Sequence, residues 1–194
     1  MEDFLFYVKI GLQHVLDINA YDHILFLAAL AVPFTYKSAK KVIILATVFT
    51  IAHCVSLSLS VYGIMVMDAY FIEIAILVSI LLAALFNLLY IKAEAENKSI
   101  RLHILITIFF GLIHGFGFST YFKLLMAEET HKIGPLLGFA TGIEVAQVLV
   151  IMCVLALSYI AQERFKVKQA WFIGVASGII ILITLPLLAE RILS

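Results

Sequence analysis

Imidazole and carboxylate side chains occur inside or at the edges of the long apolar runs of this sequence. Ionisable groups are costly in a membrane interior and usually mark a functional site there. Imidazole nitrogen and carboxylate oxygen together suit zinc, nickel, cobalt, iron or copper(II), and zinc or nickel is favoured here because no thiolate or methionine cluster accompanies them. The predicted metal ligands are His14, Asp22, His23, His53 and His114. The alternative is a polar core held together by hydrogen bonds.

Further polar residues follow helical spacing beside these candidates. Steps of three or four residues place His53 and Ser56 on one helix face, together with neighbouring threonines, and place Glu144 and Gln147 on one face of a later run. Such stripes turn inward in a membrane bundle, where they hydrogen-bond or line water. If an ion is transported, the predicted path comprises Ser56, Glu73, Glu144 and Gln147. If the metal serves an enzyme, Glu73 or Glu144 is the predicted general base.

The elements that must position these residues are predicted to be membrane-spanning helices. Of the 194 residues, 64% are hydrophobic and 13% are charged, and the mean hydropathy is +1.12. A soluble domain is about half apolar and about a quarter charged. A span needs roughly 20 mostly apolar residues, and fewer where its ends are buried against neighbours. The predicted spans are 22–36, 41–62, 69–91, 101–122, 133–160 and 171–192. We therefore expect an all-α, polytopic membrane bundle of six spanning helices that forms a single domain over residues 1–194.

A seventh apolar piece, residues 4–16, is too short to span at about 1.5 Å per residue. It is expected to lie at the membrane interface or to re-enter the bilayer as a half-helix. A half-helix that folds back would bring His14 toward Asp22 and His23, at the start of the first predicted span.

Basic residues predict the orientation of the bundle. Lysine and arginine gather in the first, third and fifth connections, at 37–41, 92–101 and 164–168, whereas the second connection has none. The positive-inside rule makes these three connections cytoplasmic and puts the chain end at residue 194 outside. At about 1.5 Å per residue, the predicted ligands and Glu144 then lie in one layer, from the outer interface to the midplane. His103 lies outside that layer.

Composition also limits the partners. The formal net charge is zero, which excludes a broad basic surface for nucleic acid. Gly134, Gly138 and Gly142 follow one another in steps of four, a spacing that lets helices approach closely and that also suits contact with a second copy of the chain. Cys54 and Cys153 fall inside predicted spans and offer no disulfide framework. The predicted partners are therefore a divalent metal ion and the lipid bilayer.

Five segments make the chain resemble a known family, in this order along the sequence: "GLQHVLDINAYDHILFLAAL", "FTIAHCVSLSLS", "FIEIAILVSI", "FFGLIHGFGFS" and "GIEVAQ". Together they resemble the HupE/UreJ family of bacterial membrane proteins, over residues 8 to 150. The resemblance implies a multi-pass protein of the bacterial inner membrane that handles a metal, since better-known members are regarded as nickel permeases. Seven residues separate His14 from Asp22, where nickel-type members have five, so the chain resembles a shorter, divergent branch.

Two classes of function fit these observations. In the first, the chain is a permease that captures a divalent metal in the outer half of the bilayer and passes it inward. In the second, it is an intramembrane metal-dependent hydrolase that acts on a lipid or peptide near the outer leaflet, where the metal activates water. A third hypothesis is that the chain is a sensor or an assembly factor. The family resemblance favours transport.

Overall fold

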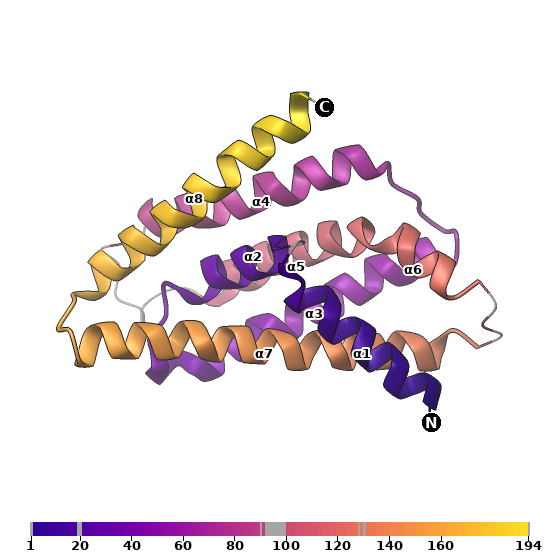
Figure 1. Cartoon of the computed structure of the whole chain (residues 1–194), viewed down its shortest axis with the longest axis horizontal. Coiled ribbons are helices and arrows are strands. Elements are labelled where there is room, and N and C mark those ends of the chain that lie inside the picture. Colours follow the sequence, from indigo (N-terminus) through magenta and orange to yellow (C-terminus); the bar gives the residue numbers. More distant parts are fainter. Residues whose placement is uncertain are drawn as a thin grey trace.

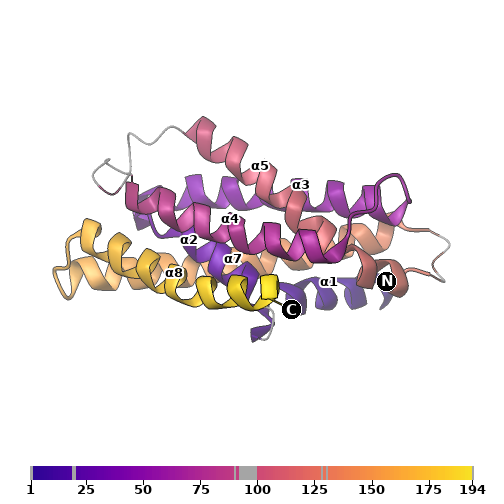
Figure 2. The same cartoon turned by 90° about the horizontal axis from the view of Figure 1, so that it is seen from above.

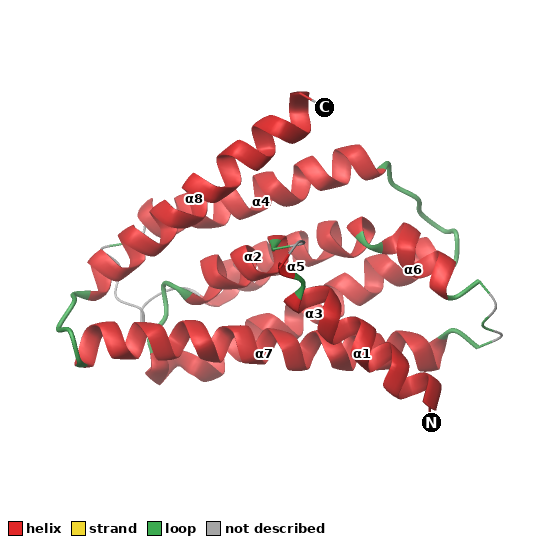
Figure 3. Cartoon of the chain, in the orientation of Figure 1, coloured by secondary structure: helices red, strands yellow, loops and turns green. Residues whose placement is uncertain are grey.

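The computed structural model describes residues 2–18, 21–89, 91, 100–127, 129 and 131–193. The described part of the chain is a bundle of eight α-helices and one short 3-10 helix, joined by short connections (Figure 3). The helices are α1 (Glu2–Leu16), α2 (Asp22–Ala31), η2 (Tyr36–Ser38), α3 (Ala39–Val61), α4 (Ala69–Leu89), α5 (Ile100–Gly117), α6 (Ser119–Leu125), α7 (Ile133–Glu163) and α8 (Gln169–Leu193). The predicted all-α architecture is confirmed.

The expected count of six spans is not confirmed. Among the described residues, four helical segments are long and apolar enough to cross a bilayer: α3 together with η2, α4, α7 and α8. A fifth span is obtained if α5 and α6, which are bent by 51° relative to each other, are counted as one. The run at 22–36 yields only the ten residues of α2. At about 1.5 Å per residue this helix covers about half of a hydrocarbon core about 30 Å thick.

The two short helices α1 and α2 follow one another along the length of the bundle (Figure 1). α1 packs beside the first part of α7, where Gly138 approaches the backbone of Phe4 and the side chain of Tyr7. α2 continues toward the end of α4, where the Asn87 side chain donates a hydrogen bond of 2.7 Å to the carbonyl oxygen of Ala29. Together they resemble a discontinuous span, interrupted between residues 17 and 21.

The two ends of the bundle differ in their connections. The connection between α2 and α3 and the connection between α7 and α8 meet at one end, which carries Lys37, Lys166 and Lys168 (Figure 1). We call this the lysine-rich end. The connections that follow α3 and α6 lie at the opposite end, as does the start of α1. Most of the predicted third basic connection, residues 92–99, lies outside the described residues.

Glycine contacts hold the helices close together. A Cβ atom on Gly142 would collide with the backbone of Val8, and a Cβ atom on Gly11 would collide with the backbone of Phe139. The close approach predicted for Gly138 and Gly142 is therefore confirmed, and it joins α7 to α1 within one chain. The prediction is wrong for Gly134, where an added Cβ atom would meet no described atom within 4 Å. At the edge of the bundle α8 packs against α4 (Figure 2).

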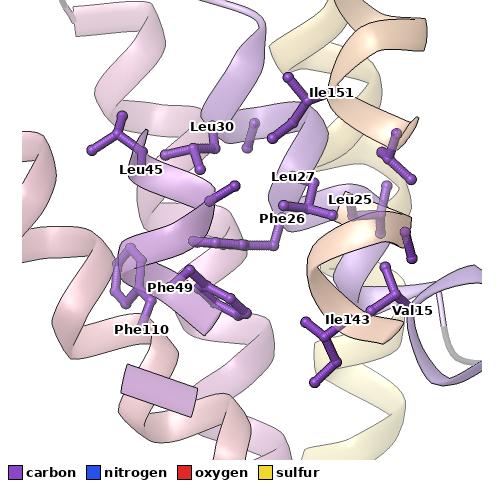
Figure 4. Close-up of a cluster of buried hydrophobic side chains, with 14 of the residues drawn as sticks. Val15, Leu25, Phe26, Leu27, Leu30, Leu45, Phe49, Phe110, Ile143 and Ile151 are labelled. Carbon is purple, nitrogen blue, oxygen red and sulfur yellow. The ribbon is translucent and has the colours of Figure 1, made fainter. Parts of the chain in front are cut away.

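An aromatic and aliphatic cluster holds α2 in place (Figure 4). The ring of Phe26 stacks on Phe49 of α3 at 4.9 Å between centroids and meets Phe110 of α5 edge-on at 5.7 Å. Leu27 and Ile143 are buried in the same core. Because these contacts lie about one turn from His23, they determine where the start of α2 is presented.

Candidate metal site

Four histidines from four helices come together in the middle of the bundle. His14 lies in the last turn of α1, His23 in the first turn of α2, His53 midway along α3 and His114 near the end of α5. The ring centroids of His14 and His23 are 4.4 Å apart, those of His23 and His114 are 5.3 Å apart, and His53 lies 5.8 Å from His14 and 6.0 Å from His23. The predicted approach of His14 to His23 is confirmed. We call these four residues the histidine cluster.

Close helix packing produces this arrangement. Gly115 of α5 lies directly against His53 and Ser56 of α3, where any Cβ atom would collide with them. This contact brings His114, the neighbour of Gly115, to the level of His53. Ser56 donates its hydroxyl to the carbonyl oxygen of His53 at 3.0 Å. The ring of Phe118 lies 3.9 Å from that of His14 and packs against it.

Buried nitrogen atoms of the cluster have no hydrogen-bond partner among the described residues. They are Nε2 of His14, His23 and His114 and both ring nitrogens of His53. His23, His53 and His114 are at most 3% exposed. An unsatisfied buried polar group costs on the order of 1–3 kcal/mol, so the cluster as it stands is incomplete. A bound cation would satisfy several of these lone pairs at once.

Hydrogen bonds at the other ring atoms direct these lone pairs. Nδ1 of His23 lies 3.2 Å from the carboxylate of Asp22, and Nδ1 of His114 lies 2.9 Å from the carbonyl oxygen of Phe110. A ring that donates through Nδ1 keeps Nε2 as its acceptor, which is the arrangement that metal-binding histidines adopt. In a neutral His14 ring, the buried Nε2 atom can offer a lone pair in the same way.

The donor atoms do not converge on one point. Within the described residues, no group of three or more His, Cys, Asp or Glu side chains is arranged as the ligands of a single ion. Binding by three of these histidines therefore requires side-chain rotation between rotamers.

A cavity of about 440 Å³ leads to the histidine cluster. Three of the histidines line it, and acidic and polar groups line it beside them. The lining includes Gln13, His14, Asp17, Asp22, His23, Glu73, His114, Phe118 and Tyr121. A water molecule takes up about 30 Å³ in the liquid, so the volume admits a cation together with part of its hydration shell. Sequence reasoning missed Gln13, Asp17 and Tyr121. Asp17 follows His14 by three residues, a spacing that could have identified it.

Glu73 reaches this cavity from α4 but is not a free carboxylate. Its Oε2 atom pairs with Nε of Arg191, near the end of α8, at 2.8 Å. The guanidinium of Arg191 also lies over the ring of Tyr70, 5.3 Å from its centroid. The sequence analysis did not predict a partner for Glu73, because Glu73 and Arg191 are far apart along the chain.

Glu144 and Gln147 belong to a different cluster. Thr47 and Thr50 of α3 each donate a hydroxyl hydrogen bond of 2.6 Å to the two carboxylate oxygens of Glu144, one to each. The hydroxyl of Thr50 also lies 3.2 Å from Oε1 of Gln147. We call these four residues the glutamate cluster. None of them is among the residues that line the cavity, so the structure does not bring Glu144 and Gln147 together with the histidine cluster.

A comparison with known families gives one match. The model of the family described as HupE / UreJ protein matches residues 1–191, nearly the whole chain. Neither the curated proteins nor the solved structures contain a match to the chain.

Proposed function

Because the chain belongs to the HupE/UreJ family, which is associated with nickel or cobalt uptake for hydrogenase and urease, we propose that it is a membrane permease for a divalent transition-metal ion. The proposal rests on one observation above all. Three buried histidines and the half-buried His14 present ring nitrogens that have no partner among the described residues, beside a cavity with an acidic lining. Neutral imidazole is a good ligand for nickel, cobalt and zinc alike.

The acidic lining of the cavity supports capture of a cation. Asp17 and Asp22 contribute carboxylates there, and Glu73 contributes a third that is paired with Arg191. A recess lined by one sign of charge raises the local concentration of ions of the opposite sign. An ion that enters this cavity can contact both carboxylate oxygens and imidazoles.

The interruption between α1 and α2 supports binding at this level. His14 lies in the last turn of α1, where the unpaired carbonyl groups carry partial negative charge that favours a cation. Asp22 opposes the partial positive charge at the start of α2. Transporters use interrupted helices in this way, because unwound backbone at mid-depth can coordinate an ion and two half-helices can move separately.

We propose that the lysine-rich end faces the cytoplasm of a bacterium and that the cavity opens outward from its inner membrane, as the positive-inside rule predicts. The inward route then continues from His53, which has both nitrogens unpaired, to Thr107. Thr107 is completely buried, and its hydroxyl has no partner among the described residues. It lies seven residues before His114 on the same face of α5, toward the lysine-rich end. Ser56, also predicted for the path, lies three residues beyond His53 on the side away from the lysine-rich end, and it donates its hydroxyl to the carbonyl oxygen of His53.

The same contacts weigh against the hydrolase. A general base must lie within hydrogen-bond reach of the water that it activates. Glu144 is held by threonines of α3, and Glu73 is paired with Arg191. Neither carboxylate is available beside the histidine cluster, which favours transport over hydrolysis.

The test is metal uptake by liposomes that contain the purified full-length protein and an enclosed metal-sensitive fluorophore. Nickel, cobalt and zinc are offered one at a time. We expect saturable uptake of at least one ion, and we expect His23→Ala and His53→Ala to remove it. His103→Ala is the matched control, because His103 packs between Phe34 and Phe86 near the lysine-rich end, away from the cluster. Equal uptake by the cluster variants and the parent protein would refute the proposal.

A further inference from the structure

The glutamate cluster lies on the side of α7 that faces away from α1. Glu144 follows Gly142 by two residues, so its side chain leaves the helix roughly opposite the face that packs on α1. On α3, Thr47, Thr50 and His53 follow one another in steps of three, each turned by about 60° around the helix, so Thr47 and His53 lie about 120° apart. The two clusters therefore occupy neighbouring faces of α3 without sharing a side chain.

The glutamate cluster has more hydrogen-bond acceptors than donor hydrogens, and one added proton or cation would balance them. The single hydroxyl hydrogen of Thr50 is shared among three acceptors: Oε2 of Glu144 at 2.6 Å, Oε1 of Gln147 at 3.2 Å and the carbonyl oxygen of Ala46 at 3.2 Å. Gln147 is completely buried, and its Nε2 atom has no partner among the described residues. Turning the amide over would leave its oxygen unpaired instead, so one polar atom of Gln147 is unmatched in either orientation.

The charge of Glu144 is also uncompensated. Thr50, its hydrogen-bond donor, lies eleven residues from each end of α3, in the middle of a spanning helix. Among the described residues, no lysine or arginine forms an ion pair with Glu144. On α3, the thiol of Cys54 interacts electrostatically with Glu144. On the other side of α7, the residue that packs from α1 is Gly11, which has no side chain. An ionised carboxylate in the membrane interior is costly unless a cation accompanies it.

We propose that the glutamate cluster is a binding site for one monovalent cation, a proton or Na⁺. The donor atoms are all oxygens: two carboxylate oxygens, one amide oxygen and two hydroxyls. Oxygen ligands suit hard cations, whereas the imidazoles of the histidine cluster suit transition metals. A single carboxylate is neutralised by a single positive charge, which makes a monovalent ion the better match.

This site provides a second ion for the permease. α3 carries Thr50 and His53 about one turn apart, so a change at the α3–α7 contact reaches the histidine cluster through one rigid helix. Coupling of the cation to metal movement rests on the proposed function, whereas binding of the cation does not. The two can therefore be tested separately.

Binding is tested with dicyclohexylcarbodiimide, an apolar reagent that modifies protonated carboxyl groups within a bilayer. Glu144 is half-buried and open to such a reagent from the side of the bundle. The full-length protein in liposomes is treated in choline buffer over a series of pH values, and adducts are located by mass spectrometry. We expect one adduct at Glu144 that is absent from Glu144→Gln, with a rate that falls as pH rises. Glu73→Gln should leave the adduct unchanged, because Glu73 pairs with Arg191 beside the cavity and is not part of the glutamate cluster.

Added salt distinguishes the two ions. If Na⁺ is the ligand, Na⁺ but not an equal concentration of K⁺ will slow the modification severalfold, and Thr50→Val will remove this protection while Thr50→Ser retains it. If the proton is the ligand, neither salt will have an effect, and Thr50→Val will extend modification to higher pH because the ionised carboxylate loses a donor. Modification that is insensitive to both pH and Na⁺, or that never occurs at Glu144, would overturn the proposal.

Uptake by the same liposomes tests the coupling. We expect a pH or Na⁺ gradient to change the rate of metal uptake severalfold in the parent protein and to have no effect in Glu144→Gln. Uptake that ignores both gradients, in a protein whose Glu144 does bind the cation, would refute the coupling alone. Failure of all metal uptake would instead refute the proposed function and leave the cation site standing.

Discussion

The histidine cluster and the glutamate cluster lie on neighbouring faces of α3, yet they differ in donor atoms and in how those atoms are paired. The histidines have buried ring nitrogens without a partner in the part of the chain that the structure describes, and they lie beside a cavity. Glu144 is held by two short hydroxyl hydrogen bonds and lies between two packed helices, away from that cavity. Nitrogen donors beside a cavity favour a transition metal that enters and leaves, whereas the oxygen donors favour a hard cation.

The difference shows how one helix serves two chemistries. Thr50 donates a hydrogen bond to Glu144 of α7. The ring of His53, turned from Thr50 by about 60° around α3, lies near His14 of α1 and His23 of α2 as well as Phe139 of α7. The same polar stripe is thus divided between two partners. Each prediction below tests whether the histidine cluster and the glutamate cluster act as separate sites or as one site.

The largest effect is expected for equilibrium binding of nickel to the purified protein. His53→Ala removes a ligand and should weaken binding by at least about tenfold, since loss of even an outer partner of a metal ligand costs that much. Glu144→Gln should leave the affinity unchanged. Binding is measured by equilibrium dialysis with elemental analysis, and an equal loss in both variants would show that the clusters form one site.

A packing change should affect the histidine cluster alone. In Gly142→Ala the new methyl group meets the backbone of Val8, so α1 must move and carry His14 with it. We expect stability to fall by about 1–3 kcal/mol and nickel affinity to fall severalfold. Gly134→Ala on the same helix is the control, because a methyl group added there would have no neighbouring atom within 4 Å. Thermal unfolding and dialysis report the two quantities, and matching results for both variants would contradict the prediction.

A smaller effect is expected at the cavity. Arg191→Gln removes the cation that pairs with Glu73, and the freed carboxylate should attract metal ions. Since a partly exposed ion pair is worth about 0.2–1 kcal/mol, we expect the half-saturating metal concentration for uptake to fall about two- to threefold. The change should shrink as salt is added. An increase in that concentration would mean that Arg191 supports the site in some other way.

The smallest effect is expected for Thr141→Val. Thr141 shares the helical spacing of Glu144, but its exposed hydroxyl donates to the carbonyl oxygen of Leu137 in its own helix. Stability should change by less than about 0.5 kcal/mol, and carbodiimide modification of Glu144 should be unaltered. A large change in the rate of modification would show that Thr141, about one turn before Glu144, also belongs to the glutamate cluster.

The sequence by itself showed that the protein belongs in a lipid bilayer, that it is helical and which family it resembles. It also identified the four histidines as candidate metal ligands. These follow from composition and from the cost of ionisable groups in lipid, which are properties of each run considered alone. It also identified Gly138 and Gly142 as points of close approach, because small residues in steps of four lie on one helix face.

The first predicted span, residues 22–36, was too long, and the reason lies in the sequence next to the end of α2. Apolar character continues past Ala31, but α2 ends there, two residues before Pro33. Val32 keeps helical geometry, but Pro33 has no backbone N–H and cannot continue the hydrogen-bond ladder of the helix. Hydropathy alone does not register that constraint.

Only the tertiary structure decided which polar residues meet. Helical spacing gives the direction of a side chain on its own helix but not the helix that it faces. It could not show that Glu144 meets Thr47 and Thr50, or that Glu73 pairs with Arg191. These contacts join residues about a hundred positions apart. They depend on how closely the helices approach, which is set by packing at glycines and aromatic rings across the whole bundle.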